Sequence, residues 1–212
     1  CHCMASCWLC QYGLDELMLT LYQFPFSHFC EKACWALDLK QQPYRAVNLL
    51  PALHLAWSRR MASASSLPIL RDGPYIVQDS SAIIDYLDQR WPQQSLTPTD
   101  VNLAGQARQW EQWLGDEIGV PLRLWFYSHV LRQRQYAMAF LLRGAARGQG
   151  LVFQALFGLI RHAMFYKMQI NPHSAAAALP QLFWTWPGEG RSITLRVVIV
   201  LADTAGMIPF GV

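Results

Sequence analysis

Two short apolar segments around a strong turn signal constrain the fold of this chain more than any other feature. Leu67–Leu70 and Tyr75–Val77 enclose the tetrapeptide Arg71-Asp72-Gly73-Pro74. Adjacent glycine and proline favour a tight turn, and short apolar runs on either side of such a turn are typical of paired strands. The sequence therefore predicts an antiparallel hairpin of two strands.

The residues before this hairpin predict the other elements of an α/β domain. Residues 18–22 and 44–48 have the composition of strands, whereas residues 26–38 carry apolar side chains at helical spacing. Pro25 suits the first position of that helix. Residues 51–60 form a connecting helix or loop. Strands joined by a helical crossover run parallel, so the predicted sheet is mixed and has helices on both faces.

A further helix is predicted directly after the hairpin. Asp79 or Ser80 is suited to cap its start, because both side chains accept hydrogen bonds from first-turn amides. The residues of this helix expected to face the core are Ile83, Ile84 and Leu87. Residues 92–98 are polar and contain two prolines, which is typical of a linker.

The chain divides into four predicted regions. These are a Cys-rich leader over 1–16, an α/β domain over 17–95, a helical domain over 101–183 and an atypical tail over 184–212. Residues 151–168 are nearly all apolar, which predicts a central buried helix in the helical domain. The tail carries a β-branched run for which no partner strand is predicted.

Composition excludes several classes of protein. The chain is 53% hydrophobic and 15% charged, which argues against intrinsic disorder, and its net charge of +3 is too small to indicate a nucleic-acid partner. Its most apolar uncharged run, residues 148–160, is too short to span a bilayer. Residues 121–180 hold seven basic and no acidic side chains. They form either ordinary solvated helix faces or a surface that attracts anions or acidic lipid head groups.

The six cysteines fall into two groups. Cys1, Cys3, Cys7 and Cys10 crowd the leader beside His2, but no second ligand pair follows at the spacing of a structural zinc site. We therefore expect no metal site and a flexible leader without the apolar stretch of a secretory signal. Cys30 and Cys34, one helical turn apart, are expected to be packing residues. Without a recognisable disulfide framework, a reducing cytoplasm is expected.

Three sequence motifs resemble those of the glutathione S-transferase family. Residues 21–33 resemble its first strand, turn and helix, and residues 66–70 and 77–87 resemble two further signatures in the same order and spacing. The resemblance implies a thioredoxin-like N-terminal domain followed by an all-α C-terminal domain. The family's closing motifs do not follow Ala178, so the helical domain is atypical or incomplete at its end.

The resemblance implies a binding site for glutathione. It implies a cis peptide bond before Pro68, which leaves the backbone of Leu67 to pair with the cysteinyl backbone of glutathione; an ordinary trans proline is the alternative. Ser80 and the helix start would hold the α-carboxylate of the γ-glutamyl group, and Asp79 the α-ammonium. Alternatively, one of these two residues merely caps the helix.

The position expected to activate the sulfur of glutathione is unusual. The family often has Ser, Tyr or Cys immediately before the proline of this turn, where this chain has Phe24, which cannot donate a hydrogen bond. The remaining candidates are the N–H groups of Phe26 and Ser27 at the helix start, the Ser27 hydroxyl, and the phenol of Tyr22. Ser27 is the preferred catalytic residue, although it could equally be a simple first-turn residue.

These features support three functional hypotheses. The leading one is a transferase that joins the thiolate of glutathione to a small hydrophobic electrophile, with glutathione as co-substrate and no further cofactor. The resemblance also implies detoxification, a homodimer and a cytoplasmic location. A non-catalytic binding or scaffold protein is the main competitor, favoured by Phe24 and the atypical tail. The third is a peripheral membrane protein that uses the basic, aromatic region 121–180.

Overall fold

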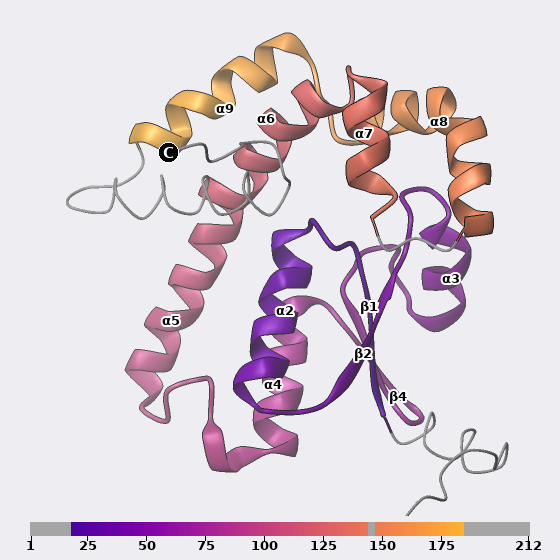
Figure 1. Ribbon diagram of the computed structural model, residues 1–212. Helices are drawn as coiled ribbons and strands as arrows, with labels where there is room; N and C mark the ends of the chain where they lie inside the picture. Colours follow the sequence, from indigo (N-terminus) through magenta and orange to yellow (C-terminus); the bar gives the residue numbers. More distant parts are fainter. Residues whose placement is uncertain (1–17, 144–146, 185–212) are drawn as a thin grey trace, which may run out of the picture. The chain divides into compact units, whose positions relative to one another are not determined.

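The computed structural model describes residues 18–143 and 147–184 (Figure 1). The described chain forms two compact units, of which the first holds the residues up to Ala107 and a short segment at 147–149. The second holds the remainder. The predicted leader, with its four cysteines, lies outside the described residues. Residues 185–212 of the predicted tail also lie outside them.

The first unit contains a four-stranded mixed sheet. Its elements are β1 Leu19–Gln23, α2 His28–Leu39, β2 Tyr44–Asn48, α3 His54–Met61, β3 Ile69–Asp72, β4 Tyr75–Gln78 and α4 Ser80–Arg90. The strand order is β2-β1-β3-β4. β1 runs parallel to β2 and antiparallel to β3, and β3 pairs antiparallel with β4. This arrangement confirms the predicted thioredoxin-like topology.

Helices cover both faces of the sheet, with α2 and α4 on one side and α3 on the other (Figure 1). Strand alternation sends Leu19 and Leu21 into a core with α2 and α4 that also contains Ile83 and Leu87. A smaller cluster of four buried residues consists of Leu49, Leu67, Ile69 and, from the first turn of α2, Cys30. The predicted inward positions of α4 are therefore confirmed for Ile83 and Leu87, while Ile84 is partly buried against the same core.

Two predicted boundaries are wrong for local reasons. The helix α2 begins at His28 rather than Phe26, because Pro25 lies in the preceding turn and not in the helix. The strand β3 begins at Ile69 rather than Leu67, because Pro68 has no N–H to donate to the sheet. The hairpin turn consists of Gly73 and Pro74, with Gly73 at a positive φ of 56° that suits glycine.

The remaining described chain is helical, as predicted. Its helices are α5 Val101–Trp113, a π-helical segment Leu114–Gly119, α6 Val120–Val130, α7 Arg134–Leu141, α8 Arg147–Lys167 and α9 Pro172–Trp184. In the second unit α6 packs along α9. Ring contacts contribute to its core, with Phe126 and Phe140 centred 4.7 Å apart. None of the described helices is both long enough and apolar enough to cross a membrane.

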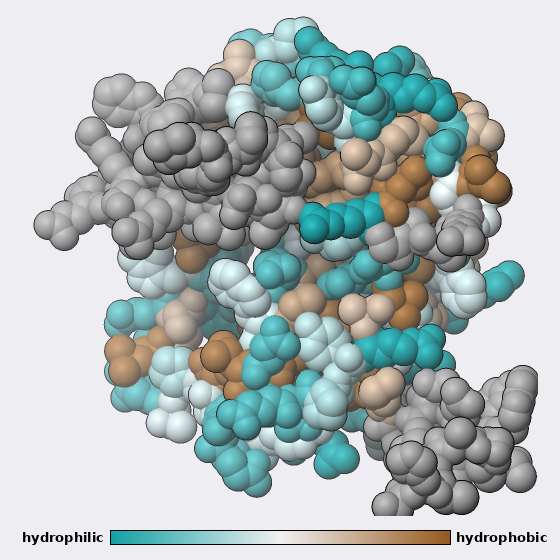
Figure 2. Space-filling model, in the orientation of Figure 1, coloured by the Kyte–Doolittle hydropathy of each residue, from teal (hydrophilic) through white to brown (hydrophobic). Residues whose placement is uncertain are grey.

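The helix α8 forms as predicted but is not central and buried. Phe153, Phe157 and Ile160 face inward, whereas Leu151 and Leu159 are each 69% exposed. The space-filling view shows hydrophobic and hydrophilic side chains next to each other on the surface (Figure 2). Periodicity cannot reveal this exposure, because a helix that is apolar on all sides needs neighbours on all sides to be buried.

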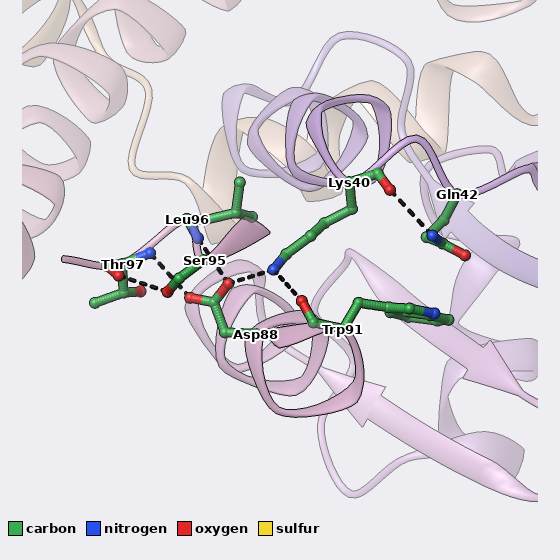
Figure 3. A network of polar contacts seen from close by, with 7 residues as sticks. All are labelled: Lys40, Gln42, Asp88, Trp91, Ser95, Leu96 and Thr97. Carbon is green, nitrogen blue, oxygen red and sulfur yellow. Dashed lines mark hydrogen bonds and ion pairs between the residues drawn. The ribbon is translucent and has the colours of Figure 1, made fainter. Parts of the chain in front are cut away.

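A buried ion pair fixes the linker after α4 (Figure 3). The Lys40 ammonium, in a side chain only 1% exposed, lies 2.7 Å from the Asp88 carboxylate and donates to the Trp91 carbonyl at 2.7 Å. The same carboxylate accepts the N–H groups of Leu96 at 2.7 Å and Thr97 at 2.9 Å. Every polar group of this pair therefore has a partner, the condition under which a buried charge is tolerated.

Candidate functional site

Strand register brings three segments of the predicted site to one end of the sheet. Tyr22 of β1 pairs with Ile69 of β3, so the turn after β1 lies beside the segment that enters β3. Ile69 in turn pairs with Gln78, so the end of β4 and the start of α4 lie at the same end. The Asp79 N–H donates to the Pro68 carbonyl at 3.2 Å, which joins two of these segments directly.

The segment between β1 and α2 is a β-turn. The Ser27 N–H donates to the Phe24 carbonyl at 3.0 Å, and Pro25 occupies the second turn position, where its fixed φ is favoured. Ser27 is the N-cap of α2, without a side-chain capping bond. Two predictions are therefore corrected: Phe26 lies in the turn rather than in the helix, and the Ser27 N–H is used within the turn.

The Cys30 thiol lies directly beneath this turn. The Phe24 N–H points at Cys30 Sγ at 3.4 Å, and the Ser27 hydroxyl also hydrogen-bonds the thiol. Burial raises the pKa of Cys30 to about 11, against the smaller lowering effect of these two hydrogen bonds. The thiol is therefore protonated at neutral pH, in agreement with its predicted role in packing.

Cys34 is the second predicted packing cysteine. It is half-buried against the core under α2, and its thiol donates to Gln23 Oε1 at 3.0 Å. Burial also raises the pKa of this thiol. Among the described residues, no group of three or more His, Cys, Asp or Glu side chains is placed to hold a metal ion.

Tyr22 and Phe24 lie against the smaller cluster of the sheet. Tyr22 is half-buried and packs on that cluster, on the face of the sheet covered by α3. Phe24 contacts His54 of α3 edge to face, with ring centroids 4.8 Å apart. The pre-proline position therefore adds apolar packing against His54, which the sequence did not single out.

The segment entering β3 is held in a defined shape. The Leu67–Pro68 peptide bond is cis, as the resemblance implied, and Leu67 is 8% exposed. Gln78 supports the preceding loop: its amide nitrogen donates to the carbonyls of Ala64 at 2.9 Å and Ser66 at 2.8 Å. Its oxygen accepts the Ala64 N–H at 3.1 Å. No sequence motif indicated this role for Gln78.

Asp79 caps α4 in an unusual backbone conformation. Its Oδ1 accepts the N–H groups of Ser81 at 2.8 Å and Ala82 at 3.3 Å. Its φ of 89° and ψ of 139° lie in a region that non-glycine residues rarely adopt. Such strain is concentrated at functional sites in proteins. Asp79 is therefore a helix cap, and its second carboxylate oxygen faces no first-turn amide.

The capping bonds of Asp79 reduce the number of N–H groups that the start of α4 can donate to a ligand. An α-helix begins with four N–H groups that lack intrahelical partners. Here Asp79 donates to Pro68, and Ser81 and Ala82 donate to Asp79. Among the described residues, the Ser80 N–H is the one first-turn amide that donates to no protein acceptor. Ser80 itself is 1% exposed.

A lysine from α2 adds positive charge beside this helix start. Lys32 Nζ donates to Ser81 Oγ at 3.2 Å, although the two residues are 49 positions apart in the sequence. The ammonium also lies 5.9 Å from the centre of the Phe29 ring. No local pattern in the sequence could indicate this placement, because it depends on α2 and α4 packing side by side.

Comparison with known proteins agrees with this geometry. The model of the glutathione S-transferase N-terminal domain matches residues 21–95. Residues 21–95 are thus similar to the N-terminal domain of glutathione S-transferases. Glutathione S-transferase 1 of Dianthus caryophyllus is 33% identical over 86 residues, which are 39% of this chain and 39% of that protein. Pyrimidodiazepine synthase of Drosophila melanogaster is 30% identical over 90 residues, 41% of this chain and 37% of that protein.

The matches thus span about two fifths of the curated relatives' length. Solved structures resemble the fold more widely. Glutathione transferase GSTFuA3 from Phanerochaete chrysosporium has a TM-score of 0.55 at 15% identity, over 89% of this chain and 85% of that chain. A glutathione S-transferase from Rhodospirillum rubrum F11 has a TM-score of 0.52 at 17% identity, over 91% and 81%. A thioredoxin-like domain followed by helices is therefore the fold of this chain.

Proposed function

We propose that this protein binds glutathione at the end of the sheet where β1, β3 and α4 meet, and transfers its thiolate to a small hydrophobic electrophile. The observation that carries the proposal is the convergence of Leu67, Ser80 and Asp79 at that end of the sheet. The curated relatives of this region that are named glutathione S-transferases give independent support.

Each polar part of glutathione has a proposed partner. The Ser80 N–H and hydroxyl bind the α-carboxylate of the γ-glutamyl group, and the ammonium of Lys32 adds favourable charge. Asp79 Oδ2 accepts the α-ammonium, because the capping bonds end at Oδ1. The backbone of Leu67 pairs with the cysteinyl peptide of glutathione as an added strand. No further cofactor is required.

The catalytic step needs the thiolate of glutathione. A free thiol has a pKa near 8.5, so the site must favour loss of its proton to solvent. We assign this role to the Ser27 hydroxyl, with the Tyr22 phenol as the second choice. The thiolate then attacks the electrophilic carbon, and the displaced electron pair leaves with the leaving group. A homodimer and a cytoplasmic location complete this proposal.

A non-catalytic glutathione-binding protein is the second candidate. It is favoured by the surroundings of Ser27, whose N–H lies in a turn and whose hydroxyl contacts the Cys30 thiol. Phe24 contributes no hydrogen-bond donor from its side chain. In this case the γ-glutamyl site is unchanged, and glutathione binds without turnover.

Two measurements test these candidates. Calorimetry on Ser80→Ala should show at least a tenfold loss of glutathione affinity, because a hydrogen bond to a charged group contributes about 1.5–3 kcal/mol. Ser128→Ala is the matched control, since Ser128 is also buried, at 3% exposed, but lies in the second unit. Equal affinity of Ser80→Ala and the wild type would refute the site.

Turnover with a chromogenic aryl halide separates the enzyme from the binding protein. Ser27→Ala should lower kcat and raise the pKa of the bound thiol, while glutathione affinity changes by no more than a few-fold. An equal loss in Tyr22→Phe instead would move the role to the phenol. Glutathione binding by the wild type without any turnover would refute catalysis and support the second candidate.

A further inference from the structure

The outward side of α8 exposes large apolar side chains along most of its length. We call this the α8 outer face; it consists of Leu151, Val152, Leu156, Leu159 and Tyr166, which are between 43% and 85% exposed. The opposite side of the helix is buried and carries Phe153, Phe157 and Ile160. An exposed row of this kind is uncommon on a protein surface that has no partner.

The α8 outer face has the shape of an interfacial helix. At about 100° per residue its five side chains fall within an arc of about 140°, and they extend over about 22 Å. Arg161 lies beyond one edge of this arc and Lys167 beyond the other, both exposed. Basic residues that flank an apolar stripe are the pattern of helices that lie in a membrane interface.

The charge around this face has a single sign. No Asp or Glu occurs between Glu117 and Glu189, whereas residues 121–180 carry seven Lys and Arg. Arg132, Arg161 and His162 line a hollow of about 360 Å³ together with Phe165. Within the part of the chain that the structure describes, no hydrogen bond or ion pair engages the side chains of these three basic residues.

We propose that the α8 outer face docks on an anionic lipid membrane. A bilayer surface presents an apolar layer directly beneath a layer of negative head groups, and the α8 outer face pairs apolar side chains with flanking cations in the same way. The hollow lined by Arg132 and Arg161 accepts a lipid phosphate. Tyr166, with an apolar ring and a polar tip, suits the head-group level. A second copy of this chain is a poorer occupant, because two cationic faces repel each other.

Co-sedimentation of the full chain with vesicles tests this proposal. Vesicles of phosphatidylcholine with 30% phosphatidylserine should bind the protein, and pure phosphatidylcholine should bind it much more weakly. Leu159→Glu should lower the partition coefficient at least about tenfold, because it removes an exposed leucine that would enter the bilayer and adds a negative charge that anionic lipids repel. Leu39→Glu is the matched control: Leu39 is 64% exposed, but it lies on α2 of the first unit.

A second pair of variants tests the charge. Arg132→Gln combined with Arg161→Gln should lower binding about 25-fold, or about fivefold per cation. Arg59→Gln combined with Arg60→Gln, on α3, makes the same change in net charge and should leave binding within twofold of wild type. The far-ultraviolet circular dichroism of each variant shows whether it is folded.

Several outcomes would overturn the proposal. These are failure of the wild type to bind anionic vesicles, equal binding of Leu159→Glu and Leu39→Glu, or a dimer in analytical ultracentrifugation that Leu159→Glu disrupts while vesicles stay unbound. Protection of α8 amides from hydrogen exchange on addition of anionic vesicles would support it without any variant. Protection by an acidic polypeptide alone would instead assign this face to a protein partner.

Discussion

Replacing Asp79 by glycine separates its structural cost from its proposed role in binding. A non-glycine residue at its φ of 89° costs about 1–3 kcal/mol, and glycine avoids most of that strain. Loss of the capping carboxylate costs only a few tenths of a kcal/mol when glycine replaces it. Glycine also lowers the stability by about 0.5–1 kcal/mol, because it gives the unfolded chain more conformational entropy. The free energy of unfolding of Asp79→Gly should therefore lie between about 0.3 kcal/mol below and about 2 kcal/mol above that of the wild type.

Alanine at the same position should behave differently. Asp79→Ala loses the bonds to Ser81 and Ala82, at a cost of about 0.5–2 kcal/mol, and keeps the strained backbone. It should be about 1–3 kcal/mol less stable than Asp79→Gly in urea unfolding. Gln41→Gly is the matched control, since Gln41 also has a positive φ, 54°, but lies at the end of α2.

Glutathione affinity completes the test. Both variants at position 79 should lose at least tenfold in affinity by calorimetry, because both lack the carboxylate proposed to meet the α-ammonium. Gln41→Gly should bind glutathione like the wild type. The reasoning about strain fails if the glycine and alanine variants are equally destabilised. The assignment of Asp79 to the ligand fails if either variant keeps wild-type affinity.

Four further predictions concern the first unit. Asp88→Ala should lower the free energy of unfolding in urea by about 3–5 kcal/mol, because it leaves the Lys40 ammonium buried without its counter-charge. Lys40→Met should lower it by only about 1–3 kcal/mol, because Asp88 still accepts the N–H groups of Leu96 and Thr97. A larger loss in Lys40→Met than in Asp88→Ala would contradict this account. Burial raises the pKa of Asp88, but hydrogen bonds from Leu96, Lys40 and Thr97 outweigh this effect and hold the pKa below its ordinary value. The stability that the Asp88 carboxylate contributes is therefore present above about pH 4 and is lost as the pH falls below that value. Asp88→Ala should not show this loss at low pH. Cys30 should resist alkylation by iodoacetamide at pH 8, because a pKa of about 11 leaves only about one thiol in a thousand ionised. If mass spectrometry of the peptide that contains Cys30 instead showed rapid alkylation, the turn above this thiol would have to open. Deleting residues 1–16 should leave the Tm unchanged, because no core pattern begins before Leu17; a marked fall, or metal bound stoichiometrically by the intact chain, would reverse the prediction.

The sequence by itself determined the elements whose signals are local. The Gly73-Pro74 turn defines the β3–β4 hairpin, and Asp79 followed by Ile83 and Leu87 defines the capped start and inner side of α4. Cap, turn and periodicity each act within a few residues, so they are visible without knowledge of the partner elements. The motif order of the glutathione S-transferase family was also visible in this way.

Tertiary structure decided which of these groups remain available to a ligand. The Ser27 N–H is used by Phe24, and the Asp79 N–H by Pro68, 11 positions away, so the amides open to glutathione are fewer than the helix starts alone suggest. Lys32 reaches Ser81 because α2 and α4 pack side by side on one face of the sheet. Likewise α8 has apolar side chains around most of its circumference, and only the side with Phe153, Phe157 and Ile160 is buried. Burial is a property of the neighbours that an element finds, and those neighbours are distant in sequence.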